Sequence, residues 1–428
     1  MVLIIDKYNK ALIGEITVSS DKSISHRAII CGALSEGDTV VNNILLSEDV
    51  LNTIDCFRKM GVNIKIEGNK VYIQGVGLYG LKKPEDVLNC GNSGTTMRLL
   101  SGILVAQDFS TILIGDDSLM NRPMKRIISP LSKMGANIIG RDGEYPPLQI
   151  QPTDNLNGIV YELPIASAQV KSSILLASLY SSGKTIIIEN KITRDHTERM
   201  LNYFGQDIVK HNNKIIVDEK QKLIGKEIYI PADISSAACF IVAASIVKGS
   251  HIIIQNVGIN PTRDGVLQIL DKMGANIVVF NKKIVNNEPI GDIEIKYSPL
   301  KACTIEGDII GRTIDELPII TVAAALADGR TIIRDAKELR YKESDRINAM
   351  TVELNKMGAK IEELPDGMII DGVDSLRPAK LNSYGDHRIA MALSISALKA
   401  KGKSSIYGSE SVSISYPDFY KTLDYLID

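Results

Sequence analysis

Residues 21–34, DKSISHRAIICGAL, place a short polar lead-in before a compact apolar segment with the length of a helix. A β-branched strand pattern follows at residues 40–41. The same phrase returns five more times along the chain in looser spelling. We expect helices at residues 92–106, 167–180, 233–247, 315–327 and 386–400. Such a repeat governs the whole fold, because each copy builds one structural unit.

A second marker recurs independently of the first. It is an apolar residue followed by glycine and, three residues after the glycine, isoleucine. It ends a second helix pattern in five copies, at Gly61, Gly135, Gly205, Gly274 and Gly358. Successive glycines lie 74, 70, 69 and 84 residues apart. Both markers therefore agree on a period of about 70 residues, and the first marker indicates six units.

The two ends of the chain complement each other. The sixth unit stops after its second helix pattern, residues 418–426, and lacks the strands of the other units. Residues 1–20 hold two strand patterns, at 2–5 and 12–18, and no helix. We expect these N-terminal strands to complete the sixth unit. This predicts an α/β protein with three units in each of two domains: residues 21–230 form one domain, and residues 1–20 with 231–428 form the other.

Composition excludes several classes of protein. The chain has 428 residues, of which 44% are hydrophobic, and a formal net charge of −2, so a nucleic-acid-binding or membrane-surface protein is not indicated. Its five cysteines form no CxxC pair, and its histidines have no metal-ligand spacing. No apolar segment approaches the roughly 20 residues that span a bilayer. We expect a cytoplasmic protein that binds no nucleic acid, membrane or metal.

Basic side chains gather where the predicted helices begin. A helix N-terminus carries unpaired N–H groups and about half a positive charge, so lysine and arginine are unfavourable there unless an anion binds. Guanidinium groups bind carboxylate and phosphate oxygens in pairs. The sequence therefore predicts anion-binding sites at these positions, which include Lys22, Arg27, Arg122, Arg194, Lys342, Arg346 and Arg388.

Three of these segments also allow a structural interpretation. Residues 92–95, NSGT, fit a backbone nest for an oxyanion, but equally a helix start capped by serine or threonine. Residues 340–347, RYKESDRI, could be a solvated first turn; on a helix, Lys342 and Arg346 would share one face. His387 could be a buried structural histidine, or could handle a proton between Asp386 and Arg388.

Eight ordered phrases carry a resemblance to the enolpyruvyl transferases, and within them to the branch that acts on shikimate 3-phosphate. They run nearly from end to end of the chain: DKSISHR at 21–27, GNSGTTMR at 91–98, NRPM at 121–124, ASAQVKS at 166–172, IDELP at 314–318, YKESDRI at 341–347, GDHRIAMA at 385–392 and SYPDF at 415–419. Eight phrases in order are far more specific than any one of them.

The resemblance implies an inside-out α/β barrel of two domains, with the active site in the cleft between them. It also implies the reaction. The 5-hydroxyl of shikimate 3-phosphate adds to C2 of phosphoenolpyruvate, and the tetrahedral adduct then loses phosphate to leave an enol ether. This chemistry belongs to the shikimate pathway of aromatic amino-acid biosynthesis. No metal or organic cofactor is expected.

The resemblance assigns a role to each matching residue. Asp315 is the expected base on the 5-hydroxyl and Glu343 the proton donor to the methylene carbon, assisted by Lys22 or His387. The expected shikimate 3-phosphate ligands are Lys22, Ser23, Arg27, Ser167, Ala168, Gln169, Arg194, Asp315 and Lys342. The expected phosphoenolpyruvate ligands are Lys22, Asn92, Gly94, Arg122, Gln169, Arg346 and Arg388.

Two positions depart from the pattern of the family. Ala168 stands where some members have a second serine, so its backbone N–H must serve the phosphate. Ile414 lies where some members have a lysine, which leaves one cation fewer for phosphoenolpyruvate.

Two alternatives compete with this interpretation. The branch that acts on UDP-N-acetylglucosamine would need a reactive cysteine in the loop at residues 115–121, GDDSLMN, which holds none. A repeat scaffold without chemistry would have no reason to place basic residues at buried helix starts.

Overall fold

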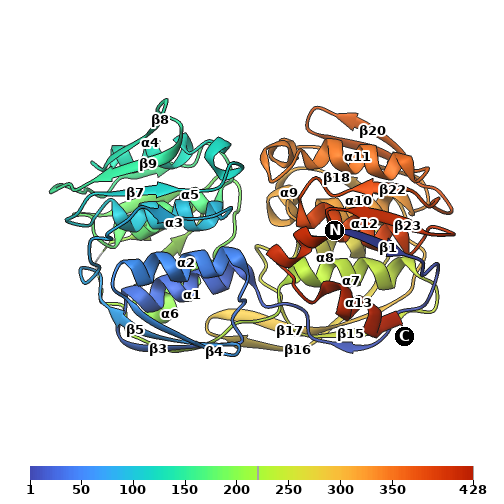
Figure 1. Ribbon diagram of the computed structural model, residues 1–428, viewed down its shortest axis with the longest axis horizontal. Coiled ribbons are helices and arrows are strands. Elements are labelled where there is room, and N and C mark those ends of the chain that lie inside the picture. The colour runs from blue at the N-terminus through green and yellow to red at the C-terminus, as the bar shows by residue number, and fades with distance from the viewer. Residues whose placement is uncertain (219–220, 428) are drawn as a thin grey trace. The chain divides into compact units, whose positions relative to one another are not determined.

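The computed structural model describes residues 1–218 and 221–427 (Figure 1). The chain divides into two compact units. Unit 1 contains Met1–Ser19, Pro231–Ile284 and Pro289–Asp428, and unit 2 contains Ser20–Ile230 and Val285–Glu288. Two details differ from the predicted boundaries. Ser20 groups with unit 2, and so do Val285–Glu288, although the residues on both sides of this segment belong to unit 1. These four residues form the tip of a hairpin, and the tip makes hydrogen bonds with other residues of unit 2.

Unit 2 contains three of the repeated sheets. Its helices are α1 (Lys22–Leu34), α2 (Glu48–Lys59), α3 (Gly94–Leu104), α4 (Lys125–Lys133), α5 (Ala168–Ser178) and α6 (His196–Phe204), with the short η1 (Leu119–Asn121). Its strands are β3 (Glu36–Asn42), β4 (Asn63–Glu67), β5 (Lys70–Val76), β6 (Leu88–Asn89), β7 (Thr111–Ile114), β8 (Asn137–Arg141), β9 (Tyr145–Gln151), β10 (Val160–Glu162), β11 (Thr185–Ile188), β12 (Val209–His211), β13 (Lys214–Val217) and β14 (Glu227–Tyr229).

Unit 1 contains the other three sheets. Its helices are α7 (Ile234–Ile246), α8 (Gly265–Lys272), α9 (Asp308–Thr313), α10 (Leu317–Ala325), α11 (Arg346–Lys356), α12 (His387–Ala397) and α13 (Phe419–Ile427), with η2 (Lys337–Tyr341) and η3 (Ser409–Ile414). Its strands are β1 (Val2–Ile5), β2 (Ile13–Ile16), β15 (His251–Gly258), β16 (Asn276–Val285), β17 (Glu288–Lys296), β18 (Thr304–Ile305), β19 (Arg330–Ile333), β20 (Lys360–Leu364), β21 (Gly367–Asp371), β22 (Lys380–Asn382) and β23 (Ser404–Tyr407).

The sheets repeat one pairing scheme. In the order β6-β7-β9-β8, the first pair is parallel and the other two are antiparallel. The orders β10-β11-β13-β12, β14-β3-β5-β4 and β18-β19-β21-β20 follow the same scheme. The same local sequence pattern therefore builds the same sheet each time it recurs.

The sequence predicted that both N-terminal strands complete the sixth unit, but only one of them does. Strand β1 does so, because it pairs antiparallel with β23 beside β22. Strand β2 instead pairs in parallel with β15 and closes the fourth sheet. The prediction for β2 was wrong because a strand pattern does not specify the sheet in which the strand pairs.

The first helix of each repeat is mostly buried. Every residue of α7 and of α10 is buried, and α7, α10 and α12 contact one another. Helix α3 contacts both α1 and α5 in unit 2. Each unit has its own hydrophobic core. An apolar helix requires such enclosure, because water would otherwise meet its hydrophobic surface. Each core therefore encloses the first helices of its own unit.

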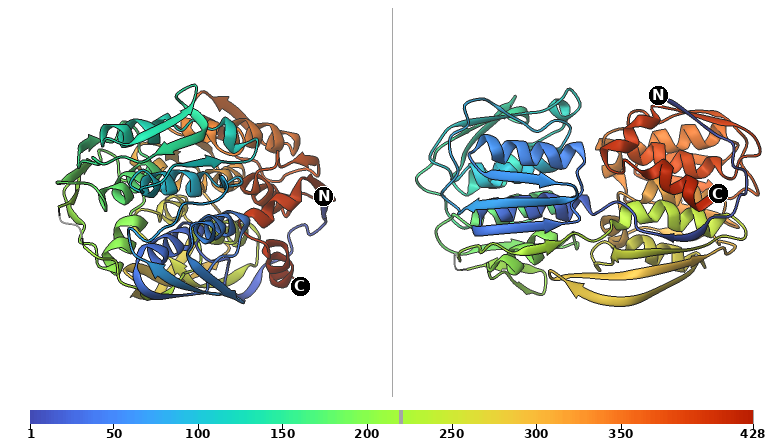
Figure 2. Two further views of the ribbon diagram at one scale, coloured as in Figure 1. Left: turned by 60° about the vertical axis from the view of Figure 1, so that its left-hand side comes forward. Right: turned by 60° about the horizontal axis from the view of Figure 1, so that its bottom comes forward.

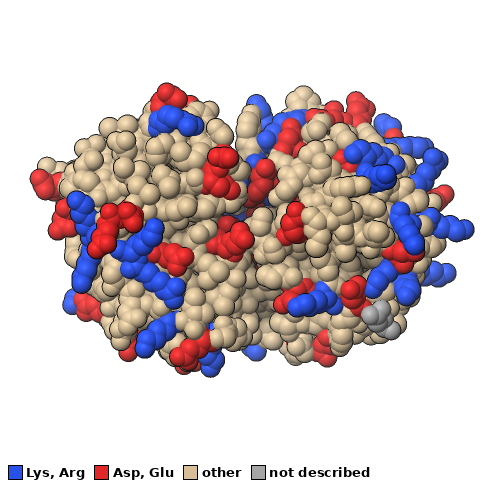
Figure 3. Space-filling model, in the orientation of Figure 1, with Lys and Arg blue, Asp and Glu red and all other residues tan. Residues whose placement is uncertain are grey.

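The surface and the helices are consistent with the composition. On the face drawn in Figure 3, lysine and arginine side chains are interspersed with aspartate and glutamate and do not gather into one basic patch. Within the described residues, no helix combines the length and apolar character needed to cross a membrane.

Candidate active site

Arg27 lies at the centre of a polar cluster in unit 2. Asp21 caps helix α1 by accepting the Ile24 N–H over 2.8 Å, which sets the register of the helix. Arg27 then follows within the first two turns and is 5% exposed. Its guanidinium donates to the Thr197 hydroxyl at 2.6 Å, the Ser172 hydroxyl at 2.9 Å and the Ser23 carbonyl at 2.8 Å. All of these partners are neutral.

Electrostatics make this cluster receptive to an anion. The pKa of Arg27 is lowered to about 10, chiefly by burial; the positive charge of Arg194 contributes to the lowering, while Glu198 and Asp21 oppose it. Arg194 is thus near enough to Arg27 for the two cations to repel. A phosphate dianion between them would remove that repulsion and supply charged hydrogen-bond partners.

A chain of hydroxyl groups joins the starts of three helices. Lys22 forms an ion pair with Asp49 of α2 at 3.1 Å. From the same region, His26 Nδ1 contacts the Thr53 hydroxyl at 2.8 Å, and Thr53 contacts the Thr96 hydroxyl at 2.7 Å. Thr96 in turn donates to the hydroxyl of the residue that caps α3, Ser93, at 2.7 Å. The relative positions of α1, α2 and α3 are therefore set by buried polar contacts.

Residues 92–95 lie at the start of α3, where Ser93 caps the helix by accepting the Thr96 N–H at 3.1 Å, as the structural interpretation predicted. Arg122 donates through Nη2 to Oδ1 of Asn92 at 2.7 Å and through Nη1 to its carbonyl at 3.2 Å. Gly94 is the first residue of α3, and a Cβ added to it would lie 2.8 Å from Nη1 of Arg98 and 3.7 Å from Nη1 of Arg122. Two guanidinium groups thus flank a helix N-terminus, an arrangement that suits a carboxylate or phosphate.

Arg98 was missing from the predicted set. It is 5% exposed and donates to the side-chain oxygen of Gln169, whose amide donates to the Thr95 hydroxyl at 3.0 Å. Arg98 thereby orients Gln169 of α5 from α3. The signal was present in the phrase GNSGTTMR at residues 91–98, but an arginine one turn inside an apolar helix does not by itself indicate a site.

In unit 1, Arg346 binds three carboxylates. Its Nε donates to Oδ2 of Asp386 at 2.8 Å, its Nη2 to Glu343 at 2.6 Å, and its Nη1 lies 3.4 Å from Oδ1 of Asp315. Burial would lower the pKa of this guanidinium, but Asp386, Glu343 and Asp315 outweigh burial and raise it. Arg346 is therefore a permanent cation. Asp386 also caps α12 by accepting the Arg388 N–H at 2.9 Å.

Lys342 does not share a helix face with Arg346, contrary to the prediction. Lys342 follows the short helix η2 with extended backbone angles, and α11 begins only at Arg346, after the cap Asp345. The two cations meet through Asp315 instead, because Lys342 Nζ lies 3.5 Å from the same oxygen that Arg346 approaches. The turn favoured by Asp345 as a helix cap overrides the helical spacing.

The remaining predicted residues lie at helix starts. Ser167 caps α5 and is followed by Ala168, the first residue of that helix. Likewise, His387 is the first residue of α12 and is 2% exposed. Among the described residues, no group of three or more histidine, cysteine, aspartate or glutamate side chains could hold a metal ion.

A scan against protein-family models matches residues 7–423 to the EPSP synthase model, described as 3-phosphoshikimate 1-carboxyvinyltransferase. The chain belongs to the EPSP synthase family. The resemblance predicted from the eight sequence phrases is therefore confirmed, down to the branch of the enolpyruvyl transferases that those phrases indicated.

Relatives and solved structures agree with this membership. A 3-phosphoshikimate 1-carboxyvinyltransferase of Thermoanaerobacter sp. (strain X514) is 51% identical over 420 residues, covering 98% of this chain and 99% of the relative. One from Crocosphaera subtropica is 53% identical over 418 residues, covering 96% and 92%. The structure of EPSP synthase from Acinetobacter baumannii superposes with a TM-score of 0.90 at 46% identity, covering 99% and 98%. The chain has the mixed α/β fold of these enzymes.

Proposed function

We propose that the protein transfers the enolpyruvyl group of phosphoenolpyruvate to the 5-hydroxyl of shikimate 3-phosphate and releases phosphate. One observation carries the proposal beyond family membership. Asp315 and Glu343, two carboxylates suited to proton transfer, are held by the guanidinium of a third residue, Arg346, at 3.4 and 2.6 Å. Addition and elimination both need a base and an acid beside a fixed cation.

Shikimate 3-phosphate has its phosphate site in the Arg27 cluster. Arg27 and Arg194 supply the charge, and Ser23 lies on the same turn of α1 as Lys22. At the start of α5, Ser167 and the backbone N–H of Ala168 extend the site, with Gln169 one residue further. The repulsion between Arg27 and Arg194 supports this assignment, because a dianion between the two cations would relieve it.

Phosphoenolpyruvate binds to the cations that surround Gly94. Arg122 and the N-terminus of α3 face one anionic group, and Asn92 and Gln169 orient it. Lys22, Arg346 and Arg388 supply further positive charge. Because the two substrates are both polyanions, binding them side by side requires several fixed cations.

The proton steps fall to the two carboxylates. Asp315 takes the proton from the 5-hydroxyl as its oxygen bonds to C2, while Glu343 delivers a proton to C3. In the elimination a proton leaves C3 and the C2–phosphate bond breaks, so inorganic phosphate departs and the double bond re-forms. Lys22 or His387 assists the transfer. Nζ of Lys342 lies 3.5 Å from Oδ1 of Asp315 and forms an ion pair with that carboxylate.

Three further properties accompany this assignment: the fold, the cellular location with the oligomeric state, and the use of cofactors. We place the six repeated units in an inside-out α/β barrel of two domains, with three units in each. The working enzyme is a cytoplasmic monomer that uses neither a metal nor an organic cofactor. The high coverage of the family model, residues 7–423, supports carrying these properties over together.

Phosphate release from phosphoenolpyruvate tests the function. The purified chain is incubated with phosphoenolpyruvate and, in parallel, with shikimate 3-phosphate, UDP-N-acetylglucosamine or no acceptor. We expect one phosphate to be released for each enol-ether product formed, and only when shikimate 3-phosphate is the acceptor. Release that depends on UDP-N-acetylglucosamine would favour the alternative branch, and no release with any acceptor would contradict an enolpyruvyl transferase.

A further inference from the structure

A long β-hairpin ends in a tip that belongs to the other unit. Strands β16 and β17 form one long hairpin (Figures 1 and 2). Most of it belongs to unit 1, but Val285–Glu288 group with unit 2. The two central residues, Asn286 and Asn287, have φ values of 50° and 62°. Positive φ at both positions is the geometry of a type I′ turn, which asparagine tolerates well. The turn therefore presents three consecutive polar residues, 286–288, in a defined conformation.

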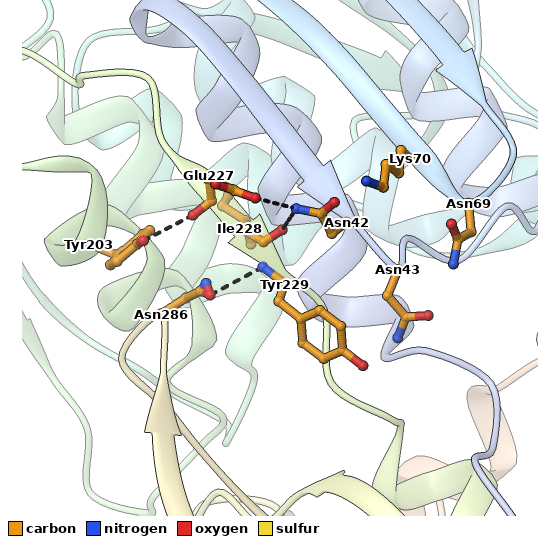
Figure 4. A pocket seen from close by; sticks show the side chains of 9 residues that line it. All are labelled: Asn42, Asn43, Asn69, Lys70, Tyr203, Glu227, Ile228, Tyr229 and Asn286. Carbon is orange, nitrogen blue, oxygen red and sulfur yellow. Dashed lines mark hydrogen bonds between the residues drawn. The ribbon is translucent and has the colours of Figure 1, made fainter.

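Each of these three residues has a partner in unit 2. Asn286 accepts the backbone N–H of Tyr229 at 3.2 Å, in a groove of about 700 Å³ (Figure 4). The carbonyl of Asn287 accepts from Nη1 of Arg199 at 2.8 Å. Oε1 of Glu288 lies 2.7 Å from Nδ1 of His196. Because an ionised carboxylate can only accept, the imidazole donates from Nδ1.

The contact between Glu288 and His196 is buried on both sides. The side chains are 4% and 3% exposed. Removing such a polar pair from water is costly, and an apolar pair of the same shape often serves stability as well or better. The directional hydrogen bond provides what an apolar contact cannot: it fixes the orientation of the first residue of α6.

The first turn of α6 reaches the proposed phosphate site. The hydroxyl of Thr197, next to His196, accepts from Nε of Arg27 at 2.6 Å. Arg194, the second cation of the site, lies two residues before His196. Glu198, two residues after His196, forms an ion pair with buried Lys171 at 2.7 Å. Lys171 therefore contacts this turn through Glu198, and Glu288 contacts it through His196.

We propose that Glu288 is a positioning residue for the shikimate 3-phosphate site, acting through His196 to set Thr197 and Arg194 around Arg27. The inference rests on the proposed function and adds a residue far along the sequence, beyond the segment that supplies the phosphate ligands. It touches neither substrate. Loss of its carboxylate turns the start of α6, so that Thr197 and Arg194 no longer surround Arg27 in the binding geometry.

The test compares Glu288→Ala with Glu288→Gln in the full-length chain. The alanine variant loses the acceptor, and we expect the Kd and KM for shikimate 3-phosphate to rise about 10-fold or more. The KM for phosphoenolpyruvate, measured with saturating shikimate 3-phosphate, stays within about 2-fold, because its ligands lie on other elements. The glutamine variant keeps an amide oxygen for Nδ1 and restores most of the affinity. If the alanine variant does not fold, Glu288→Asp withdraws the acceptor by one methylene and carries the same expectation.

Glu294→Ala is the matched control. Glu294 lies on the same strand, β17, and Oε1 of its side chain is also 2.7 Å from a histidine ring, that of His251, but this pair is exposed. Its substitution leaves both substrate constants unchanged. Wild-type affinity for shikimate 3-phosphate in Glu288→Ala would overturn the proposal. Equally weaker binding of both substrates would also overturn it, since this would indicate a general loss of structure.

The control with wild-type protein separates this inference from the proposed function. If the wild type releases no phosphate from the two substrates, the function itself fails. If the wild type is active and only the selective effect of Glu288→Ala is missing, the function stands and the positioning role of Glu288 is rejected.

Discussion

Arg346 and Asp386 form a buried ion pair in which Nε donates to Oδ2 at 2.8 Å and Nη2 to Oδ1 at 3.2 Å. The side chains are 2% and 0% exposed. This two-point contact fixes the plane of the guanidinium and directs its Nη1 toward Asp315. The carboxylate that caps α12 thus also aligns the cation beside both proposed proton-transfer groups, although Asp386 itself was not among the predicted site residues.

Replacing Asp386 by alanine should strongly destabilise the protein. The change leaves a buried guanidinium without its main partner, which typically costs roughly 3 kcal/mol, and it also removes the cap of α12. We expect a lower urea midpoint and a weaker affinity for phosphoenolpyruvate. Asp371→Ala is the control, because Asp371 forms a similar two-point pair with Arg330 on an exposed sheet surface. Equal urea midpoints for the two variants would contradict the importance assigned to burial.

Asp315→Asn should abolish turnover without abolishing substrate binding. The amide keeps the shape of the carboxylate but cannot accept the hydroxyl proton, so we expect kcat to fall about 10²- to 10⁴-fold. The Kd for shikimate 3-phosphate, measured by calorimetry, should change little, because the phosphate ligands lie elsewhere. A variant that retains the wild-type rate would remove Asp315 from its role as the base.

Part of the site could be predicted from sequence because it is local. Asp21, Ser167 and Asp386 precede apolar helices, and each caps its helix in the structure. The basic residues one or two turns later were therefore placed at the correct helix starts. The same reasoning failed for Lys342, where a helix cap three residues later ended the expected periodicity.

Contacts between distant segments could not be predicted in this way. Arg98 meets Gln169 across 71 residues, Arg27 meets Thr197 across 170, and His196 meets Glu288 across 92. Periodicity assigns residues to a face of an element and says nothing about the element on the other side. The dipeptide Asn286-Asn287 was a readable signal for a tight hairpin, but not for the unit to which its tip would bind.

Gly94→Ala should weaken phosphoenolpyruvate binding selectively. The added Cβ would lie 2.8 Å from Nη1 of Arg98, closer than atoms tolerate, so the flexible guanidinium must shift. The fold survives, but the anion site changes shape, and we expect the KM for phosphoenolpyruvate to rise about 10-fold. Gly258→Ala is the control, because its new Cβ would have its nearest neighbour at 3.6 Å, an ordinary contact. Equal KM values for Gly94→Ala and wild type would show that the space beside α3 is not used.

His26 should make the protein sensitive to acid. Burial lowers the pKa of His26 to about 3, with Lys22 and Arg27 adding to the shift and Asp49 opposing it. The unfolded chain binds a proton at this position near the ordinary pKa of 6.5, whereas the folded chain does not until about pH 3. Between these values the unfolded state holds more protons, so stability falls as pH falls. The linkage amounts to about 2.5 kcal/mol between pH 7 and pH 4.5.

His26→Asn tests this contribution because its amide can still meet the Thr53 hydroxyl, which His26 Nδ1 contacts at 2.8 Å. The variant is less stable at pH 7, since it fills the buried site less well, but its urea midpoint should change less between pH 7 and pH 4.5 than that of the wild type. The other acidic transitions remain in both proteins and cancel in the comparison. His251→Asn, at a half-exposed histidine, should retain the wild-type slope. If His26→Asn loses as much stability over this pH range as the wild type, protonation of His26 does not contribute to acid unfolding.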